Sequence, residues 1–107
     1  MEWVDVLAET DLPEGKGTRA ESPWGPLLLF RAGDSVFAIS NVCSHQGASL
    51  HKGTVNRSAT IPMATCPAHG SMFDMRGGSV RRGPAMHPVA AYDARAEDGR
   101  IQVAQRS

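Results

Sequence analysis

Short apolar runs separated by glycine and proline dominate the chain, and stretches with helical periodicity are scarce. WVDVLAE (3–9), PLLLF (26–30) and SVFAIS (35–40) have the length and content of β-strands. The last two runs are separated by four residues that include Gly33, which predicts a β-hairpin. Near the C-terminus, EDG (97–99) separates AAYDARA from RIQVAQ and predicts a second hairpin.

A further strand is expected at 59–64, where Pro62 indicates either an edge strand or a strand end. Turn-forming residues crowd the segment 75–88. Several short strands with regular turn signals are typical of an all-β antiparallel sandwich or barrel. The chain has 107 residues and shows no repeat or linker, so we expect one domain that spans residues 1–107.

The charge balance and the N-terminal sequence limit the classes of partner. The 11 basic residues balance the 11 acidic ones, which argues against a nucleic-acid partner. The opening MEWVDVLAET lacks the basic and apolar segments of a secretory signal. No apolar run approaches the roughly 18 residues that a membrane span needs. We therefore expect a soluble, cytoplasmic protein without a membrane partner.

The candidate chemistry lies in two short segments, CSHQGASL (43–50) and CPAHGSMFD (66–74). They contain the only two cysteines of the chain, and each cysteine has a histidine two or three residues further on. The first segment follows the strand-like run 35–40, and the second follows a strand that we expect to end near Thr65. Both are therefore expected on loops that project from a rigid β scaffold, which is the usual place for a functional site.

Several interpretations of these residues compete. The cysteines could be small buried hydrophobic residues, Cys43 and Cys66 could form a redox disulfide, or one Cys–His pair could be catalytic. None of these explains why both cysteines come with a histidine. Two thiolates and two imidazoles form a complete four-ligand metal set. Structural zinc sites usually pair like ligands, whereas mixed pairs suit a binuclear cluster in which one iron takes both cysteines and the other takes both histidines.

Cys43-x-His45 with Cys66-x-x-His69 resembles the binding motif of Rieske [2Fe–2S] proteins. FDMRGGSVRRGPA (73–85) and YDARAEDGRIQV (92–103) resemble later parts of the same family, so that the resemblance covers about residues 3–104. It is similar in particular to the ferredoxin component of bacterial aromatic-ring-hydroxylating dioxygenase systems. The 20 residues between His45 and Cys66 are a few more than the family pattern suggests, which predicts a longer hairpin at 56–60.

The resemblance implies one [2Fe–2S] cluster, held by two loops at one tip of a Rieske-like antiparallel β sandwich or barrel. Cys43, His45, Cys66 and His69 would be its ligands. Glycines next to the motifs would permit tight loops and let backbone N–H groups reach sulfur, and a proline loop would shield the cluster. The residues that the resemblance places around the cluster are Gly47, Gly70, Ser71, Phe73 and Pro84. His51 and His87 match no ligand position and are expected at the surface.

The ligand set also bears on the reduction potential. With two thiolates the oxidised cluster is neutral, so it accepts an electron more readily than a cluster with four thiolates; Rieske centres span roughly −150 to +300 mV, against about −400 mV for plant-type ferredoxins. High-potential relatives carry a disulfide at positions that match Ala48 and Ala68, and a tyrosine where this chain has Phe73. These differences imply the low-potential class, and Ser71, where those relatives also have serine, would raise the potential within it.

The chain shows no nucleophile set, no phosphate-binding loop and no flavin or nicotinamide fingerprint, so we expect an electron carrier and not an enzyme. The resemblance implies a monomer that passes one electron at a time from a NAD(P)H-dependent flavin reductase to a terminal oxygenase, in aromatic hydrocarbon catabolism. Both partners would bind transiently. The alternatives are a Rieske subunit of another redox enzyme, such as a nitrite-reductase-like system, or a zinc-stapled interaction module.

Overall fold

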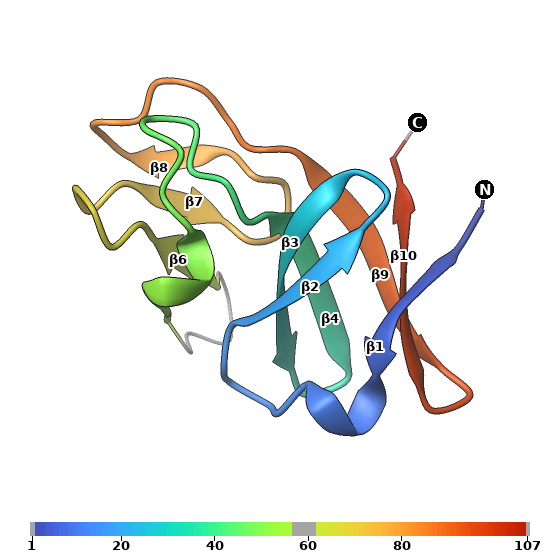
Figure 1. Cartoon of the computed structure of the whole chain (residues 1–107). Helices are drawn as coiled ribbons and strands as arrows, with labels where there is room; N and C mark the ends of the chain where they lie inside the picture. The colour runs from blue at the N-terminus through green and yellow to red at the C-terminus, as the bar shows by residue number, and fades with distance from the viewer. Residues whose placement is uncertain (1, 57–61, 107) are drawn as a thin grey trace.

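The structure of the protein is a computed structural model that describes residues 2–56 and 62–106. It consists of short strands and two 3₁₀ turns joined by loops (Figure 1). The elements in the described residues are β1 (Val4–Ala8), η1 (Glu9–Asp11), β2 (Thr18–Ser22), β3 (Gly25–Ala32), β4 (Ser35–Ser40), η2 (Leu50–Lys52), β5 (Thr54–Val55), β6 (Met63–Thr65), β7 (Met72–Asp74), β8 (Val80–Arg82), β9 (Ala91–Glu97) and β10 (Arg100–Gln105). In that part of the chain no helix is long and apolar enough to cross a bilayer.

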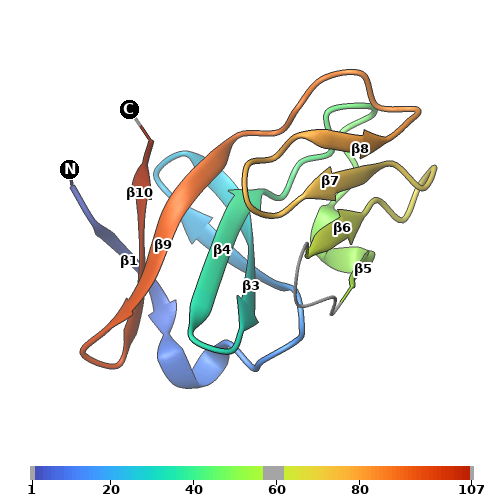
Figure 2. The same cartoon turned by 180° about the vertical axis from the view of Figure 1, so that it is seen from behind.

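Two antiparallel sheets make up the fold. The larger sheet has six strands in the order β1-β10-β9-β4-β3-β2, and its two edge strands lie close together, so that the sheet nearly closes into a barrel. The smaller sheet has four strands in the order β5-β6-β7-β8 and lies on one side of the barrel (Figures 1 and 2). The predicted all-β antiparallel architecture is confirmed.

Both predicted hairpins are present. β3 pairs with β4 from Leu27 opposite Ser40 to Ala32 opposite Ser35, which leaves a two-residue turn. β9 pairs with β10 in the same way, and its turn consists of Asp98 and Gly99. Both of these residues have positive φ, 51° and 78°, as the tight turn that matches the strand twist requires.

The sequence pattern missed four strands: β2, β7, β8 and the two-residue β5. β2 is mostly polar and buries only Ala20, whereas β7 and β8 have three residues each, which is too short for a periodic signal. The strand expected at 59–64 begins only at Met63; its predicted residues 59–61, and most of the expected turn at 56–60, lie outside the described residues. Pro62 therefore lies at a strand end, immediately before the first residue of β6. It does not mark an edge strand, because β5 and β7 flank β6.

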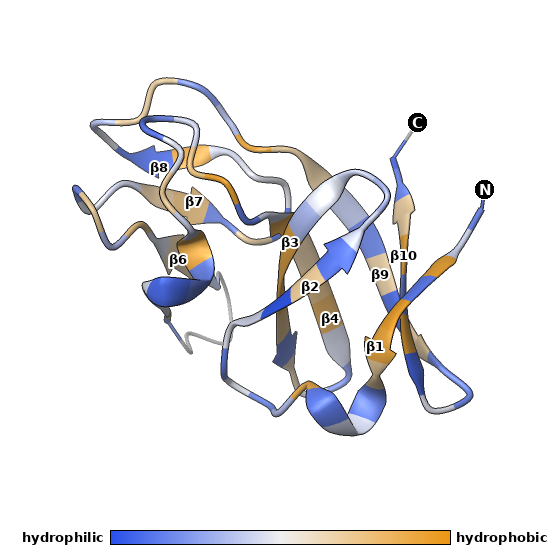
Figure 3. Cartoon of the chain, in the orientation of Figure 1, coloured by the Kyte–Doolittle hydropathy of each residue, from blue (hydrophilic) through white to orange (hydrophobic). Residues whose placement is uncertain are grey.

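β3 is buried on both faces, which explains its continuous apolar run. Leu27 and Leu29 contact the barrel interior with Tyr92 and Ile101, whereas Leu28 and Phe30 contact a second core. This second core lies between the two sheets and includes both cysteines. Figure 3 shows apolar colour along much of β3 and mostly polar colour on η1. The cysteine loops are thus rooted in the core that joins barrel and small sheet.

Candidate metal centre

The two cysteine loops share one backbone pattern. The carbonyl of Cys43 accepts the N–H of Gly47 at 2.9 Å, and the N–H of Cys43 donates to the carbonyl of Ala48 at 2.9 Å. In the second loop the carbonyl of Cys66 accepts from Gly70 at 3.1 Å, and its N–H donates to Ser71 at 2.7 Å. Each cysteine is therefore fixed by a compact turn of the same spacing, one after β4 and one between β6 and β7.

Gly47 and Gly70 occupy positions that demand glycine. Their φ values are 75° and 77°, in the left-handed region that other residues rarely adopt. Their N–H groups bond to the cysteine carbonyls and close the two turns. The backbone N–H groups of His45 and Gln46 lower the pKa of the Cys43 thiol, against the larger raising effect of burial. The first loop thus directs two backbone N–H groups toward the Cys43 sulfur, whereas the N–H of Gly47 closes the turn.

The base of the first loop is closed by Asn41, which sequence reasoning missed. The Asn41 side chain is buried, and its carbonyl oxygen accepts the backbone N–H of His51 at 2.8 Å. Its amide nitrogen lies 2.8 Å from His51 Nδ1. His51 is half-buried, not the surface residue that we expected, because it ties the two ends of the loop together.

The four predicted ligands come together in two layers. Cys43 and Cys66 are only 2% and 3% exposed, are free thiols, and lie close enough to hydrogen-bond to one another. His45 and His69 lie outside them and are exposed to solvent. Their ring centroids are 5.2 Å apart and the rings are nearly perpendicular, at 84°. The cysteine pair therefore faces the core and the histidine pair faces solvent.

A third segment, residues 83–88, crosses both loops and is called the strap here. Figures 1 and 2 show it running across the tip beside the first loop. The hydroxyl of Ser71, which is fully buried, accepts the backbone N–H of Ala85 at 3.0 Å. The hydroxyl of Ser44 donates to the carbonyl of His87 at 2.5 Å. The strap is thereby tied to both loops, and Ala85 enters the core beside the cysteines while Pro84 stays exposed.

The model of one known family, described as the Rieske [2Fe–2S] domain, matches residues 2–93. The chain belongs to the Rieske [2Fe–2S] family. A relative from Burkholderia cepacia, the anthranilate 1,2-dioxygenase ferredoxin subunit, is 31% identical over 95% of this chain and 91% of its own length. The Rieske protein described here is thus a ferredoxin, an electron carrier and not an enzyme.

Solved structures of other Rieske proteins resemble this chain over nearly its whole length. The ferredoxin of carbazole 1,9a-dioxygenase from Nocardioides aromaticivorans IC177 has a TM-score of 0.88 and 34% identity, covering 99% of this chain and 100% of that one. A complex of oxygenase and ferredoxin in carbazole 1,9a-dioxygenase gives 0.83 and 28%, covering 98% and 95%. A putative NADH-dependent nitrite reductase small subunit from Mycobacterium tuberculosis gives 0.83 and 32%, covering 99% and 96%.

The donor arrangement fits one [2Fe–2S] cluster of the Rieske type. Burial raises the pKa of the Cys43 thiol, and the neighbouring Cys66 raises it further, so two thiolates at this place need a cation between them. Among the described residues, no group of three His, Cys, Asp or Glu side chains is placed to hold a single metal ion. In a Rieske cluster two histidines replace two cysteines on one of the two irons. The separate cysteine and histidine pairs match that requirement.

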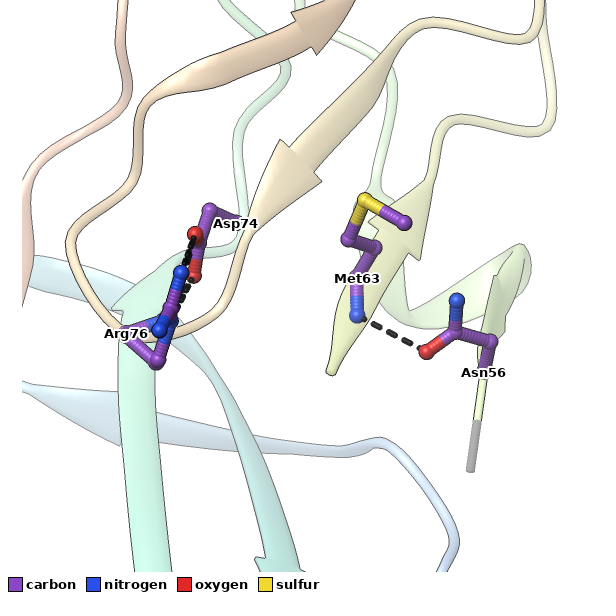
Figure 4. Close-up of polar contacts among 4 residues, drawn as sticks. All are labelled: Asn56, Met63, Asp74 and Arg76. Carbon is purple, nitrogen blue, oxygen red and sulfur yellow. Dashed lines mark hydrogen bonds and ion pairs between the residues drawn. The ribbon is translucent and has the colours of Figure 1, made fainter. Parts of the chain in front are cut away.

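Phe73 lies fully buried in the same core as the two cysteines and carries no hydroxyl that could donate to sulfur. Polar contacts hold β7 and its neighbour β6 at the end of the small sheet where Met63 and Asp74 pair (Figure 4). The Asp74 carboxylate accepts hydrogen bonds from the Arg76 guanidinium at 2.7 Å and from the Arg76 backbone N–H at 2.8 Å. The Asn56 side chain accepts the backbone N–H of Met63 at 3.1 Å. These contacts fix the strands that lead into and out of the second loop.

Replacing Ser71 by alanine is expected to lower the free energy of unfolding by about 1–2 kcal/mol, because the buried Ala85 N–H loses its acceptor. The midpoint potential should fall as well, since the hydroxyl has a proton to donate toward the cluster. Denaturant unfolding and voltammetry measure the two effects. Ser44→Ala is the matched control: it removes the other hydrogen bond of the strap at an exposed position, and should change both quantities less. Equal effects of the two variants would contradict the role given to Ser71.

Acid should weaken the fold partly through Asp74. Hydrogen bonding from Arg76 lowers the pKa of the Asp74 carboxyl below its ordinary value of 3.8. A lowered pKa in the folded state stabilises the fold above pH of about 4, and this stabilisation is lost as the pH falls through the folded-state pKa. Asp74→Asn should therefore cost roughly 1 kcal/mol at neutral pH and flatten the acid limb of the stability curve. Urea unfolding of both proteins at a series of pH values checks this, and parallel acid limbs would refute it.

Proposed function

We propose that this Rieske ferredoxin carries single electrons from a NAD(P)H-dependent flavin reductase to a terminal oxygenase that hydroxylates aromatic rings. The observation that carries the proposal is end-to-end similarity to ferredoxins of dioxygenases, at 31% and 34% identity. A ferredoxin with 28% identity has been solved in complex with its oxygenase, which supports an oxygenase as the partner.

The proposed ligands are Cys43, His45, Cys66 and His69, with the two cysteines on one iron and the two histidines on the other. The cluster supplies reversible one-electron transfer when it is bound. The chain contributes the rest: two sheets hold the loops, the core excludes water from the thiols, and the exposed imidazoles are the part of the site nearest to a docked protein.

A low potential is part of this proposal. Ala48 and Ala68 stand where a bridging disulfide would lie, and the chain has no cysteine beyond the two proposed ligands. Phe73 brings no hydroxyl to the cluster environment. With fewer donors to stabilise the extra negative charge of the reduced form, the potential should lie in the lower part of the Rieske range of roughly −150 to +300 mV. One domain spanning residues 1–107 and a monomeric state complete the proposal.

Reconstitution with purified partners tests the function. The flavin reductase and the oxygenase encoded nearest to this chain would be combined with it, NADH and an aromatic substrate. Hydroxylated product should form at a rate proportional to the concentration of the ferredoxin. His69→Ala supplies the control, since it removes a proposed ligand that lies on the surface. Product formed at an equal rate without the ferredoxin would overturn the proposal.

One solved structure supports a second candidate function for this chain. The putative nitrite reductase small subunit from Mycobacterium tuberculosis is 32% identical, which is close to the identity of the dioxygenase ferredoxins. In that alternative the chain would deliver electrons within a nitrite-reducing enzyme. Spectra of the cluster cannot separate the two, because the ligand set would be the same. Adding the chain to a nitrite reductase large subunit, and measuring NADH-dependent loss of nitrite, separates them.

A further inference from the structure

The tip of the molecule carries no formal charge. The tip is defined here as the two loops and the strap, residues 42–49, 66–71 and 83–88. None of these residues is Asp, Glu, Lys or Arg, although the chain has 11 acidic and 11 basic residues. All the formal charge is thus placed on the remainder of the molecule. A partner that docks on this face meets imidazoles, short polar side chains and apolar groups.

The same tip holds the large hydrophobic side chains that are left in solvent. Among the described residues, Met86 at 85% exposure and Val42 at 45% are the exposed large hydrophobic residues, and both belong to the tip. The other large apolar side chains of the described part are buried or half-buried. Exposed apolar groups gathered at one place on an otherwise polar surface mark an interaction site.

Met86 is held in position although it is exposed. Its neighbour on one side, Ala85, donates to the buried Ser71 hydroxyl, and its neighbour on the other side, His87, accepts from Ser44. The backbone of Met86 is therefore fixed to both ligand loops, while its flexible thioether side chain projects into solvent. A fixed backbone lowers the ordering cost of docking, and a methionine side chain adapts to partner surfaces of different shape.

We propose that redox partners dock on this charge-free tip with Met86 as the central apolar contact, and that the tip selects proteins whose electron-accepting or electron-donating surface is likewise uncharged and apolar. The proposal rests on the electron-carrier function. His45 and His69 are exposed residues of the same tip, so docking there brings the partner toward their imidazoles. A strongly charged partner surface would be disfavoured, because its charges would lose water without gaining an ion pair.

The border of the tip adds a limited electrostatic contribution. Arg81 and Arg82 are exposed and end β8, immediately before the strap. Carboxylates on the partner that reach this border would form exposed ion pairs, which contribute little and are screened by salt. The apolar contact at Met86 therefore contributes more to the affinity of the proposed interface than the arginines at its border.

Electron self-exchange between oxidised and reduced copies of the holoprotein, measured by NMR line broadening, tests the proposal. The probe partner is a second copy of the protein, whose tip is an uncharged apolar surface. Self-exchange has no net driving force, so a change in its rate is not caused by a shifted midpoint potential. Met86→Ala should slow exchange about tenfold, which corresponds to roughly 1.4 kcal/mol. Met86→Leu should stay within about twofold of the native rate, because it keeps the apolar bulk.

Charge placed on the tip gives an independent readout. Met86→Glu should slow self-exchange at low ionic strength and recover part of the rate in salt, because each encounter then brings two carboxylates together. Gln105→Glu is the matched control: it adds the same charge at an exposed position on β10, outside the tip, and should leave the rate unchanged. A native rate in both Met86→Ala and Met86→Glu would overturn the proposal. Failure of the electron-carrier function would be recognised separately from failure of the docking proposal, because the holoprotein would then show no reversible one-electron reduction.

Discussion

His69→Cys is expected to lower the midpoint potential by on the order of 100 mV, since Rieske centres and four-cysteine ferredoxins differ by roughly 250 mV or more for two such replacements. The reason is charge: a thiolate in place of a neutral imidazole makes both oxidation states of the cluster more negative by one unit. His69 is exposed at the end of its loop, so the new side chain needs no rearrangement of the core. Voltammetry of the purified variant measures the shift.

His45→Cys should shift the potential in the same direction, because both histidines are assigned to one iron. His87→Cys is the control, since His87 is exposed and is not a proposed ligand, and it should leave the potential as it is. An unchanged potential in a His69→Cys protein that still assembles its cluster would remove His69 from the ligand set. The visible spectrum establishes assembly before the potential is read.

Cys43→Ala is expected to abolish cluster binding and to destabilise the fold. Cys43 and Cys66 come from different sheets, so the cluster cross-links them, and closing a loop of this length is worth about 3 kcal/mol. For a domain of this size, that loss should lower the melting temperature by more than about 10 °C. Iron analysis and calorimetry of the variant provide the two measurements.

The wild-type protein stripped of iron by a chelator is the reference for this variant. If the cluster supplies the stability, the stripped protein and Cys43→Ala should melt at similar temperatures. A Cys43→Ala protein that retains stoichiometric iron would refute the ligand assignment. One that loses iron yet melts like the native holoprotein would show that the two sheets hold together without the cross-link.

Local patterns in the sequence were sufficient for the hairpins and for the position of the motifs. The turns around Gly33 and Gly99 depend on residues next to each other in the sequence, and the structure contains both hairpins as predicted. The same holds for the placement of Cys43 after β4 and of Cys66 after β6, because both strands end where the apolar runs end. The family motif then supplied the ligand set, which apolar periodicity alone could not have done.

Contacts between distant segments could not be predicted in this way. Ser44 bonds to His87 and Ser71 to Ala85, across 43 and 14 residues, and no local pattern marks either pair. β7 and β8 are too short to show a period, and their pairing depends on the core around Phe73.

The division of the ligands between two sheets has a consequence for the protein after it loses iron. The small sheet consists of strands of two or three residues, which cannot persist without support from neighbouring structure. Two of the three segments that form the tip adjoin this sheet, so iron loss should loosen the docking face together with the site. Damaged copies would then cease to compete with intact ones for the same partners, and a mixed population would deliver electrons in proportion to its intact fraction.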